Sequence, residues 1–334
     1  MVAAAWRRRV RSQDASRLCA CSRDPAFQLR KSVSRWVVNM KKFSRYCRSI
    51  LFTPALVAER SIKADAADAD IALIDLEDSV AAIHKAEARN RAVAFSSRPP
   101  ITVCRRAVRI NNLGSADGLL DLLALCGCPY KPEVVMVPKV ESPRDLEIAG
   151  SLLGDGVELI AIIETPLGIE NISATVSTRA RLTATIFGAA DFALTTGMSI
   201  DWQSQHYARS RLATATRGAG LHPLDSPWFD VRDTEGLTTA AKRARELGYS
   251  GMGAVHPCQV PIINEIFSPS QDDIDRARRL VAASASDGSG ICLIDGIAVG
   301  APFIESARRL LQEFDAPRPM VTGYYAEPAN IGQA

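Results

Sequence analysis

The chain has 334 residues, 47% of them apolar and 23% charged, a composition typical of a globular protein with a sizeable core and not of a disordered chain. The formal net charge of +3 is uneven, because residues 1–40 carry nine of the 40 basic residues and two of the 37 acidic ones. The rest of the chain is therefore slightly acidic, which gives no electrostatic case for nucleic-acid binding. No stretch is apolar for long enough to predict a membrane span.

Residues 1–44 are expected to form a basic, disordered extension outside the fold. They are rich in Arg and Ser and poor in acids, a composition that also fits an organelle transit peptide, and Met40 stands where translation could begin instead. The eight cysteines of the chain form no CxxC pair and several lie in apolar segments. This usage favours reduced thiols and a cytoplasmic location.

From residue 49 the pattern alternates between apolar strands and amphipathic helices eight times. The predicted strands are 49–53, 71–76, 102–110, 134–138, 159–163, 184–187, 221–224 and 252–255. Near-continuous apolar strands separated by helices predict a parallel sheet, and eight such units predict a closed (β/α)₈ (TIM) barrel over residues 45–267. An open, doubly wound sheet is the alternative, but no GxGxxG follows the first strand.

Two carboxylates stand at the ends of consecutive strands. Glu164 directly follows the apolar run 159–163, and Asp191 comes four residues after the run that ends at Phe187. In a barrel of this kind the carboxyl ends of the strands carry the active site. Mg²⁺ commonly takes one or two carboxylates, so the pair predicts a magnesium site, although either acid alone fits a helix cap or a turn.

Charged residues also follow the second, third and fourth strands. Asp75, Glu77 and Asp78 are expected partly to cap the helix predicted at 79–94 and partly to hold water around the metal. Arg109 suits capture of a substrate carboxylate or, alternatively, a structural ion pair. Lys139 is expected to remain charged and ion-paired rather than to form a Schiff base.

Residues 268–334 continue beyond the barrel as a C-terminal helical extension. Helices are predicted at 272–283 and 302–314, with an apolar piece at 291–294 and the dipeptide Asp295-Gly296 between them. A closed barrel has no internal place for these residues. They are expected to cover an opening or to reach a neighbouring subunit.

The motifs of residues 48–312 resemble the HpcH/HpaI aldolase/citrate lyase family, in particular the citrate lyase β subunit and the malyl-CoA and citramalyl-CoA lyases. The matching pieces occur in the family's order and at the expected barrel positions. They are RSILFTP (48–54), DLEDSV (75–80), KxxAR (85–89), RIN (109–111), PKVE (138–141), IETPxG (163–168), FGAAD (187–191), YARS (207–210), LGYSG (247–251), HPxQ (256–259) and FSPS (267–270).

The resemblance implies a role for four residues. Glu164 and Asp191 match the family's Mg²⁺ ligands, and Arg109 matches the arginine that holds the carboxylate of the 2-oxo acid. Asp295 matches the aspartate that reaches the active site of a neighbouring subunit in the CoA-ester lyases. It would act there as the acid or base on the acetyl-CoA-type enolate, although a surface turn is the alternative for this residue.

The expected function is therefore a Mg²⁺-dependent carbon–carbon lyase that acts on a CoA thioester of the citryl, malyl or citramalyl type. An active site completed by a second chain implies a homo-oligomer, a trimer or a dimer of trimers. A CoA-independent class II 2-oxo acid aldolase and a non-catalytic subunit of a larger lyase complex are the alternatives. Ala55 and Met252 replace the glycine and lysine usual in the family, which concerns how the thioester arm is held.

Overall fold

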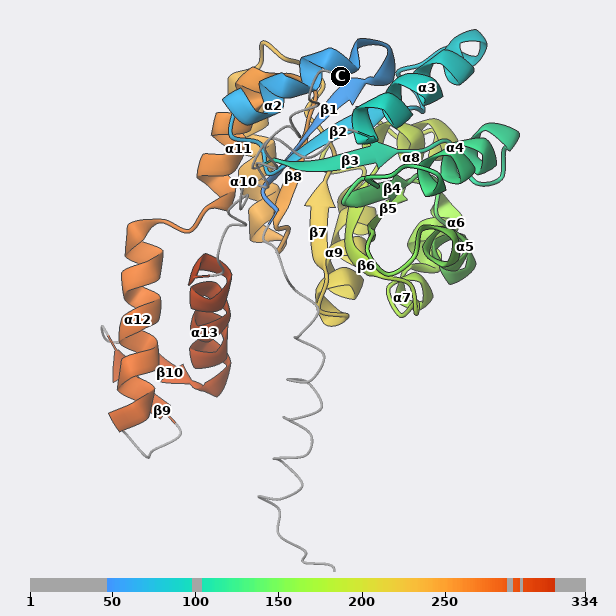
Figure 1. Cartoon of the computed structure of the whole chain (residues 1–334). Coiled ribbons are helices and arrows are strands. Elements are labelled where there is room, and N and C mark those ends of the chain that lie inside the picture. Colours follow the sequence, from blue (N-terminus) through green and yellow to red (C-terminus); the bar gives the residue numbers. More distant parts are fainter. Residues whose placement is uncertain (1–46, 98–103, 287–290, 295–296, 316–334) are drawn as a thin grey trace, which may run out of the picture. The chain divides into compact units, whose positions relative to one another are not determined.

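The computed structural model describes residues 47–97, 104–286, 291–294 and 297–315, and its central feature is a closed parallel barrel (Figure 1). The eight strands pair in sequence order, and β1 closes the barrel by pairing with β8 from Ser49 opposite Met252. The strands are β1 (Ser49–Pro54), β2 (Ile71–Asp75), β3 (Arg105–Arg109), β4 (Val134–Val137), β5 (Glu158–Ile163), β6 (Leu182–Phe187), β7 (His222–Asp225) and β8 (Gly251–Ala254). The predicted (β/α)₈ barrel is confirmed.

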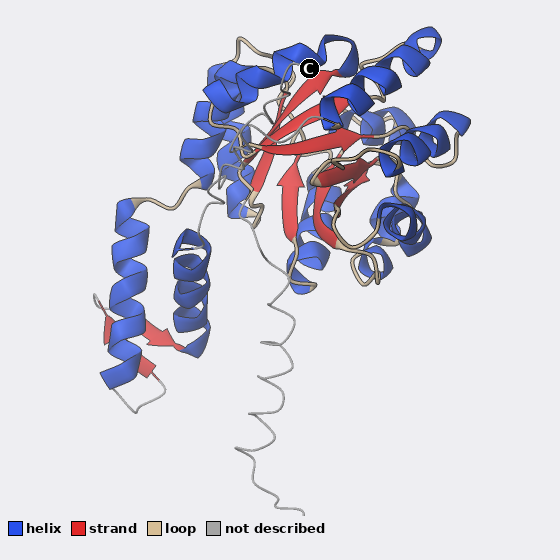
Figure 2. Ribbon diagram, in the orientation of Figure 1, coloured by secondary structure: helices blue, strands red, loops and turns tan. Residues whose placement is uncertain are grey.

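Helices surround the strands on the outside of the barrel (Figure 2). Three of the described helices begin with a capping side chain, because Ser115, Thr165 and Asp233 accept from backbone N–H groups of the first turn. The helices of the barrel are α2 (Ile62–Ala66), α3 (Lys85–Ser96), α4 (Ala116–Cys126), α5 (Pro143–Leu153), α6 (Pro166–Glu170), α7 (Ile172–Thr175), α8 (Ala189–Thr196), α9 (His206–Gly218), α10 (Thr234–Glu246) and α11 (Val260–Phe267). Short 3₁₀ segments lie at η2 (Ala55–Ser61), η3 (Ala82–His84) and η4 (Pro257–Gln259).

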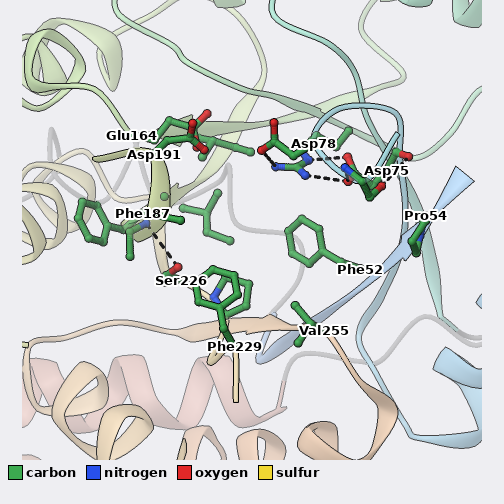
Figure 3. Close-up of a pocket in the computed structure, with 18 residues that line it drawn as sticks. Phe52, Pro54, Asp75, Asp78, Glu164, Phe187, Asp191, Ser226, Phe229 and Val255 are labelled. Carbon is green, nitrogen blue, oxygen red and sulfur yellow. Dashed lines mark hydrogen bonds and ion pairs between the residues drawn. The ribbon is translucent and has the colours of Figure 1, made fainter. Parts of the chain in front are cut away.

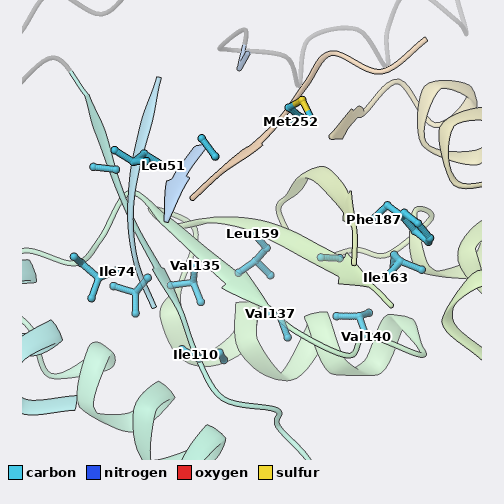
Figure 4. Packing of buried hydrophobic residues seen from close by; sticks show 14 of the residues in the cluster. Leu51, Ile74, Ile110, Val135, Val137, Val140, Leu159, Ile163, Phe187 and Met252 are labelled. Carbon is cyan, nitrogen blue, oxygen red and sulfur yellow. The ribbon is translucent and has the colours of Figure 1, made fainter. Parts of the chain in front are cut away.

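Alternate residues of each strand belong to two separate apolar clusters. Leu51, Ile74 and Leu159 pack in the larger cluster, between the strands and the helices (Figure 4). Their neighbours Ile50 and Leu73 belong to the smaller cluster, formed by strand residues that face the barrel interior. Side chains of a strand point to opposite faces in turn, so residue parity decides which strand-end side chains face the barrel axis.

Three features differ from the sequence-based expectation. The helix after β2 begins at Lys85 and not at residue 79, and its N-terminus has no side-chain cap. The carboxylate of Asp75 instead accepts the backbone N–H groups of Glu77 and Ser79, which holds the intervening chain in a turn. The prediction that these acids cap the helix was wrong. The eighth strand is predicted to end at residue 255, but β8 ends at Ala254 and Val255 lies in the loop that follows.

The C-terminal part contains helices α12 (Gln271–Ser286) and α13 (Ala301–Asp315), which pack against each other. Strands β9 (Ile291–Ile294) and β10 (Ile297–Gly300) form an antiparallel pair between them in the sequence. Asp295 lies outside the described residues, and the division of the chain at residues 44 and 267 stays a prediction. Within the described ranges, no helix is both long and apolar enough to cross a membrane.

A buried histidine in β7 leads to a prediction for stability. Burial, together with the nearby charge of Arg217, lowers the pKa of His222 to about 3. The unfolded chain takes up this proton near pH 6.5 and the folded chain does not, so the histidine makes stability fall as the pH drops below that value. Between pH 7 and pH 5, His222 is expected to lower the free energy of unfolding by about 2 kcal/mol.

Urea unfolding of the unaltered protein and of His222→Asn at both pH values measures this contribution. The Asn side chain retains a polar group near Ser250, which lies 3.0 Å from the imidazole Nδ1. We expect the variant to lose less stability on acidification than the unaltered protein. Equal losses would contradict the assignment.

Candidate active site

The strand ends bring charged side chains to one end of the barrel interior. Leu73 faces the interior, and so does Asp75 two residues later; the same spacing relates Ala107 to Arg109 and Ile162 to Glu164. All three charged residues line one cavity at the carboxyl ends of the strands. Residues two apart on a strand face the same side, so the charged residues at the strand ends lie directly above the apolar residues of the barrel interior.

Glu164 is a buried carboxylate among other acids. Its side chain is 2% exposed, and its Oε1 accepts a hydrogen bond of 2.9 Å from the backbone N–H of Lys139. Burial, followed by the charges of Glu77 and Asp191, raises the pKa of Glu164 to about 8. A carboxylate held in this way gains from a nearby cation, because a cation stabilises its charged form.

Lys139 connects three of the acids and has an unusual backbone. Its φ of 51° lies in the left-handed region, which costs a non-glycine residue about 1 kcal/mol. This conformation directs the backbone N–H to Glu164 while the side chain donates to Glu77 Oε1 at 2.6 Å and lies 3.5 Å from Asp191 Oδ1. These partners raise the pKa of Lys139 although burial acts to lower it, so the residue stays charged, as expected for an ion-paired lysine.

Arg109 lies in a network of ion pairs. Its Nε and Nη2 donate to the two oxygens of Asp75 at 2.6 and 2.7 Å, and its Nη1 lies 3.0 Å from Glu77 Oε2 and 3.6 Å from Asp78 Oδ2. Burial acts to raise the pKa of Asp75, but the hydrogen bonds and charge of Arg109 lower it below its usual value. The structural ion pair left open by the sequence is thus present, and the role of Arg109 toward a substrate stays a prediction.

A second set of hydrogen bonds fixes the loops that follow β2 and β3. Lys85 Nζ donates to the carbonyls of Leu76 and Glu77 and to Asn111 Oδ1, all within 2.8 Å. Asn111 in turn donates to the buried carboxylate of Asp121. Lys85 at the start of α3 thus joins the loop that carries Glu77 to the loop that follows Arg109, which gives the KxxAR and RIN pieces of this chain a common structural role.

The cavity has a volume of about 440 Å³ and two unlike sides (Figure 3). Glu164 and Asp191 lie close together on one side, with Asp75 and Asp78 further along the same rim. Its full lining is Phe52, Pro54, Asp75, Asp78, Ser79, Arg109, Ile162, Glu164, Ile186, Phe187, Gly188, Ala189, Ala190, Asp191, Ser226, Pro227, Phe229 and Val255. Sequence reasoning missed Phe229 and Val255, for which no charge or motif gave a signal.

The residues of the acidic rim fit a hard divalent cation. Across the residues described, no three His, Cys, Asp or Glu side chains gather closely enough to hold a metal by themselves. Glu164 and Asp191 supply two carboxylates, which suits Mg²⁺ because that ion usually keeps several positions for water or substrate oxygens. Burial and the neighbouring acids raise the pKa of Glu164, which shows that the protein alone does not fully stabilise its charged form. A bound cation would supply the missing positive charge.

Gly188 makes room for Glu164, and this leads to a prediction. A Cβ at position 188 would collide with the Cβ and Oε2 of Glu164. We expect Gly188→Ala to displace that carboxylate, lowering turnover about 10²-fold and stability by about 1–3 kcal/mol. The matched control is Gly218→Ala in α9, where an added Cβ meets no atom within 4 Å. Turnover and urea unfolding of both variants test this prediction. Equal turnover of Gly188→Ala and Gly218→Ala would contradict it.

Fold and cavity together define a (β/α)₈-barrel protein with an acidic site at the carboxyl ends of its strands. The chain belongs to the HpcH/HpaI aldolase/citrate lyase family, whose model matches residues 48–257. This confirms the resemblance inferred from the motifs, and the family's named relatives include lyases.

Three relatives show how far the similarity extends. A (3S)-malyl-CoA thioesterase of Cereibacter sphaeroides is 32% identical over 80% of this chain and 95% of its own length. The mitochondrial citramalyl-CoA lyase of Homo sapiens is 28% identical, covering 78% of this chain and 83% of the relative. The structure of CitE from Mycobacterium tuberculosis, in complex with magnesium, acetoacetate and coenzyme A, has a TM-score of 0.68 and 31% identity, covering 81% of this chain and 99% of that one.

Proposed function

We propose that this chain is a Mg²⁺-dependent carbon–carbon lyase. Its substrate is a CoA thioester of a 3-hydroxy acid, which it cleaves into an acyl-CoA and a 2-oxo acid or forms from them. The observation that carries the proposal is the pairing of Glu164 with Asp191 in one cavity, next to Arg109 and Lys139. The relatives named as lyases, and the magnesium in the M. tuberculosis structure, support the same reading.

Each residue of the rim has a distinct part in this proposal. Glu164 and Asp191 would hold the Mg²⁺, and the bound ion would supply Lewis-acid stabilisation of negative charge on the substrate oxygens. Arg109 orients the substrate carboxylate through its remaining N–H groups while Asp75 fixes the guanidinium plane. Lys139 positions Glu164 through its backbone N–H and Asp191 through its side-chain charge. Glu77 and Asp78 supply negative charge that offsets the nearby cations.

The test is a screen of the purified full-length chain with Mg²⁺ against citryl-, malyl- and citramalyl-CoA. The quantity measured is the release of the 2-oxo acid. Cleavage of at least one thioester, lost on removal of the metal, is the expected result. Cleavage of a free 4-hydroxy-2-oxo acid without CoA would instead indicate a class II aldolase. Inactivity of the isolated chain toward every substrate would indicate a subunit of a larger complex.

The proposal extends to assembly and location. We propose a homo-oligomer, a trimer or a dimer of trimers, because Asp295 would act in the site of a second chain. A cytoplasmic location is part of the proposal, and the free thiols of Cys47, Cys104, Cys126, Cys128 and Cys258 favour a reducing compartment. Light scattering and the distribution of a fluorescent fusion test the two statements.

A further inference from the structure

The side of the cavity away from the carboxylates is apolar. Phe52, Phe229 and Val255 form it, and we refer to these three residues as the apolar wall (Figure 3). Phe229 is 52% exposed and Val255 is 37% exposed, so a ligand in the cavity would cover hydrocarbon that now faces solvent. The wall is built by the loops after β7 and β8 and by the interior-facing residue of β1.

The loops of the wall are held in place by a buried side chain. Gln259 is 2% exposed; its Oε1 accepts from the N–H groups of Val255 and His256, and its Nε2 donates to the carbonyl of Trp228. One amide thus joins the residue before Phe229 to Val255 itself. The apolar wall is a fixed part of the fold and not a collapsed loop.

The cations of the site are already engaged by its acids. Among the described lining residues Arg109 is the one cation, and it is paired with Asp75 and Glu77. Lys139, just behind the rim, is paired with Glu77 and Asp191. Arg109 lies over the Phe52 ring, with its Cζ 5.5 Å from the ring centroid, so the cation nearest the apolar wall is the one already paired with Asp75 and Glu77.

With charges on one side of the cavity and the apolar wall on the other, the site would distinguish 2-oxo acids by the substituent on the carbonyl carbon. The shared carboxylate and carbonyl oxygens belong at the acidic rim, where the metal and Arg109 are proposed to hold them. The remaining substituent then points across the cavity. A carboxylate beside Phe229 and Val255 would lose water without gaining an unpaired counter-charge, because Arg109 at the Phe52 end is already paired with acids, whereas a hydrocarbon group would be favoured by contact with the aromatic and aliphatic surface.

We propose that the apolar wall selects a 2-oxo acid with a hydrocarbon substituent, of the pyruvate or 2-oxobutyrate type, over one with a second carboxylate, of the oxaloacetate type. The proposal rests on the lyase function proposed above and names its substrate class. Phe229 is the specificity-determining residue, because it presents the largest exposed surface of the wall.

The first experiment measures condensation by the full-length chain with Mg²⁺ and acetyl-CoA. The acceptors are glyoxylate, pyruvate, 2-oxobutyrate and oxaloacetate. We expect kcat/KM for pyruvate to exceed that for oxaloacetate by about 100-fold, since the site would leave a buried charge unpaired. A ratio below about tenfold overturns the proposal. No condensation with any acceptor would instead refute the lyase function, so the two failures are distinguishable.

The second experiment places a cation in the wall. Phe229→Arg is expected to narrow the pyruvate-to-oxaloacetate ratio about three- to tenfold, because a half-exposed charge can pair with the second carboxylate. Tyr130→Arg is the matched control, since Tyr130 is an aromatic residue of 49% exposure that does not line the cavity. Calorimetric titration with pyruvate and with oxaloacetate provides a second readout that needs no turnover.

The outcome with Phe229→Arg decides what the wall contacts. An unchanged ratio, equal to that of Tyr130→Arg, overturns the assignment of Phe229. A changed KM for acetyl-CoA with an unchanged acceptor ratio also overturns it, because the wall would then hold the thioester arm. A narrowed ratio in both turnover and binding supports it.

Discussion

Replacing Asp191 with Asn is expected to abolish Mg²⁺-dependent turnover, and Glu164→Gln should have the same result. Each change removes a ligand charge at nearly constant shape, and loss of several kcal/mol of charge stabilisation corresponds to at least about 10³-fold in rate. The fold should persist, because a Gln at position 164 can still accept the hydrogen bond from the Lys139 backbone N–H. Initial rates at several Mg²⁺ concentrations measure the effect.

Metal binding gives a readout that is independent of catalysis. Calorimetric titration with Mg²⁺ should show binding to the unaltered protein and none to either variant. Glu170→Gln in α6 is the control, since Glu170 is an exposed acid outside the cavity. Turnover by Asp191→Asn above about a tenth of the normal rate, at saturating Mg²⁺, would show that this carboxylate does not hold the metal.

Asp295→Asn is expected to lower kcat by about 10²–10⁴-fold, the usual contribution of a general acid or base, with Mg²⁺ affinity unchanged. Asp295 follows Ile294 of β9 in the sequence, about forty residues beyond β8. An acid so far from the barrel strands along the chain is a candidate to act on a second subunit. Steady-state kinetics together with Mg²⁺ titration separate its effect from that of the metal ligands.

Subunit mixing tests whether Asp295 acts between chains. Oligomers assembled from Asp295→Asn and Asp191→Asn subunits should recover part of the activity, because some sites would combine two intact halves. Each variant mixed with itself is the control. Absence of recovery after verified subunit exchange would place the acid in its own chain's site or remove it from the mechanism.

Some features of the site required the folded chain. The sequence places Arg109 at a strand end, but the pairing of its guanidinium with Asp75 depends on β2 and β3 lying in register, with Asp75 opposite Arg109. Likewise, the left-handed backbone of Lys139 follows from contacts with three acids distant in sequence. Such pairings depend on which carboxylates are desolvated together, and this is a property of the assembled interior.

The apolar wall shows the same limit. Phe52 and Val255 stand in predicted strands, although Val255 lies in the loop after β8, whereas Phe229 lies in a loop where an aromatic residue carries no periodic signal. Their convergence on one cavity depends on how the loops after β7 and β8 are joined by Gln259. The group that the site selects could therefore be inferred only from the structure.

Strand periodicity and motifs were enough to predict the barrel, the family and the rim of acids. Strand periodicity is local, so the apolar runs that end at Ile163 and Phe187 specify buried strands and place Glu164 and Asp191 just beyond them. Which rim charges neutralise each other, and which side of the cavity stays apolar, could be seen only in the folded chain. Both depend on side chains brought together from different β/α units, and closure of the barrel is the physical event that does so.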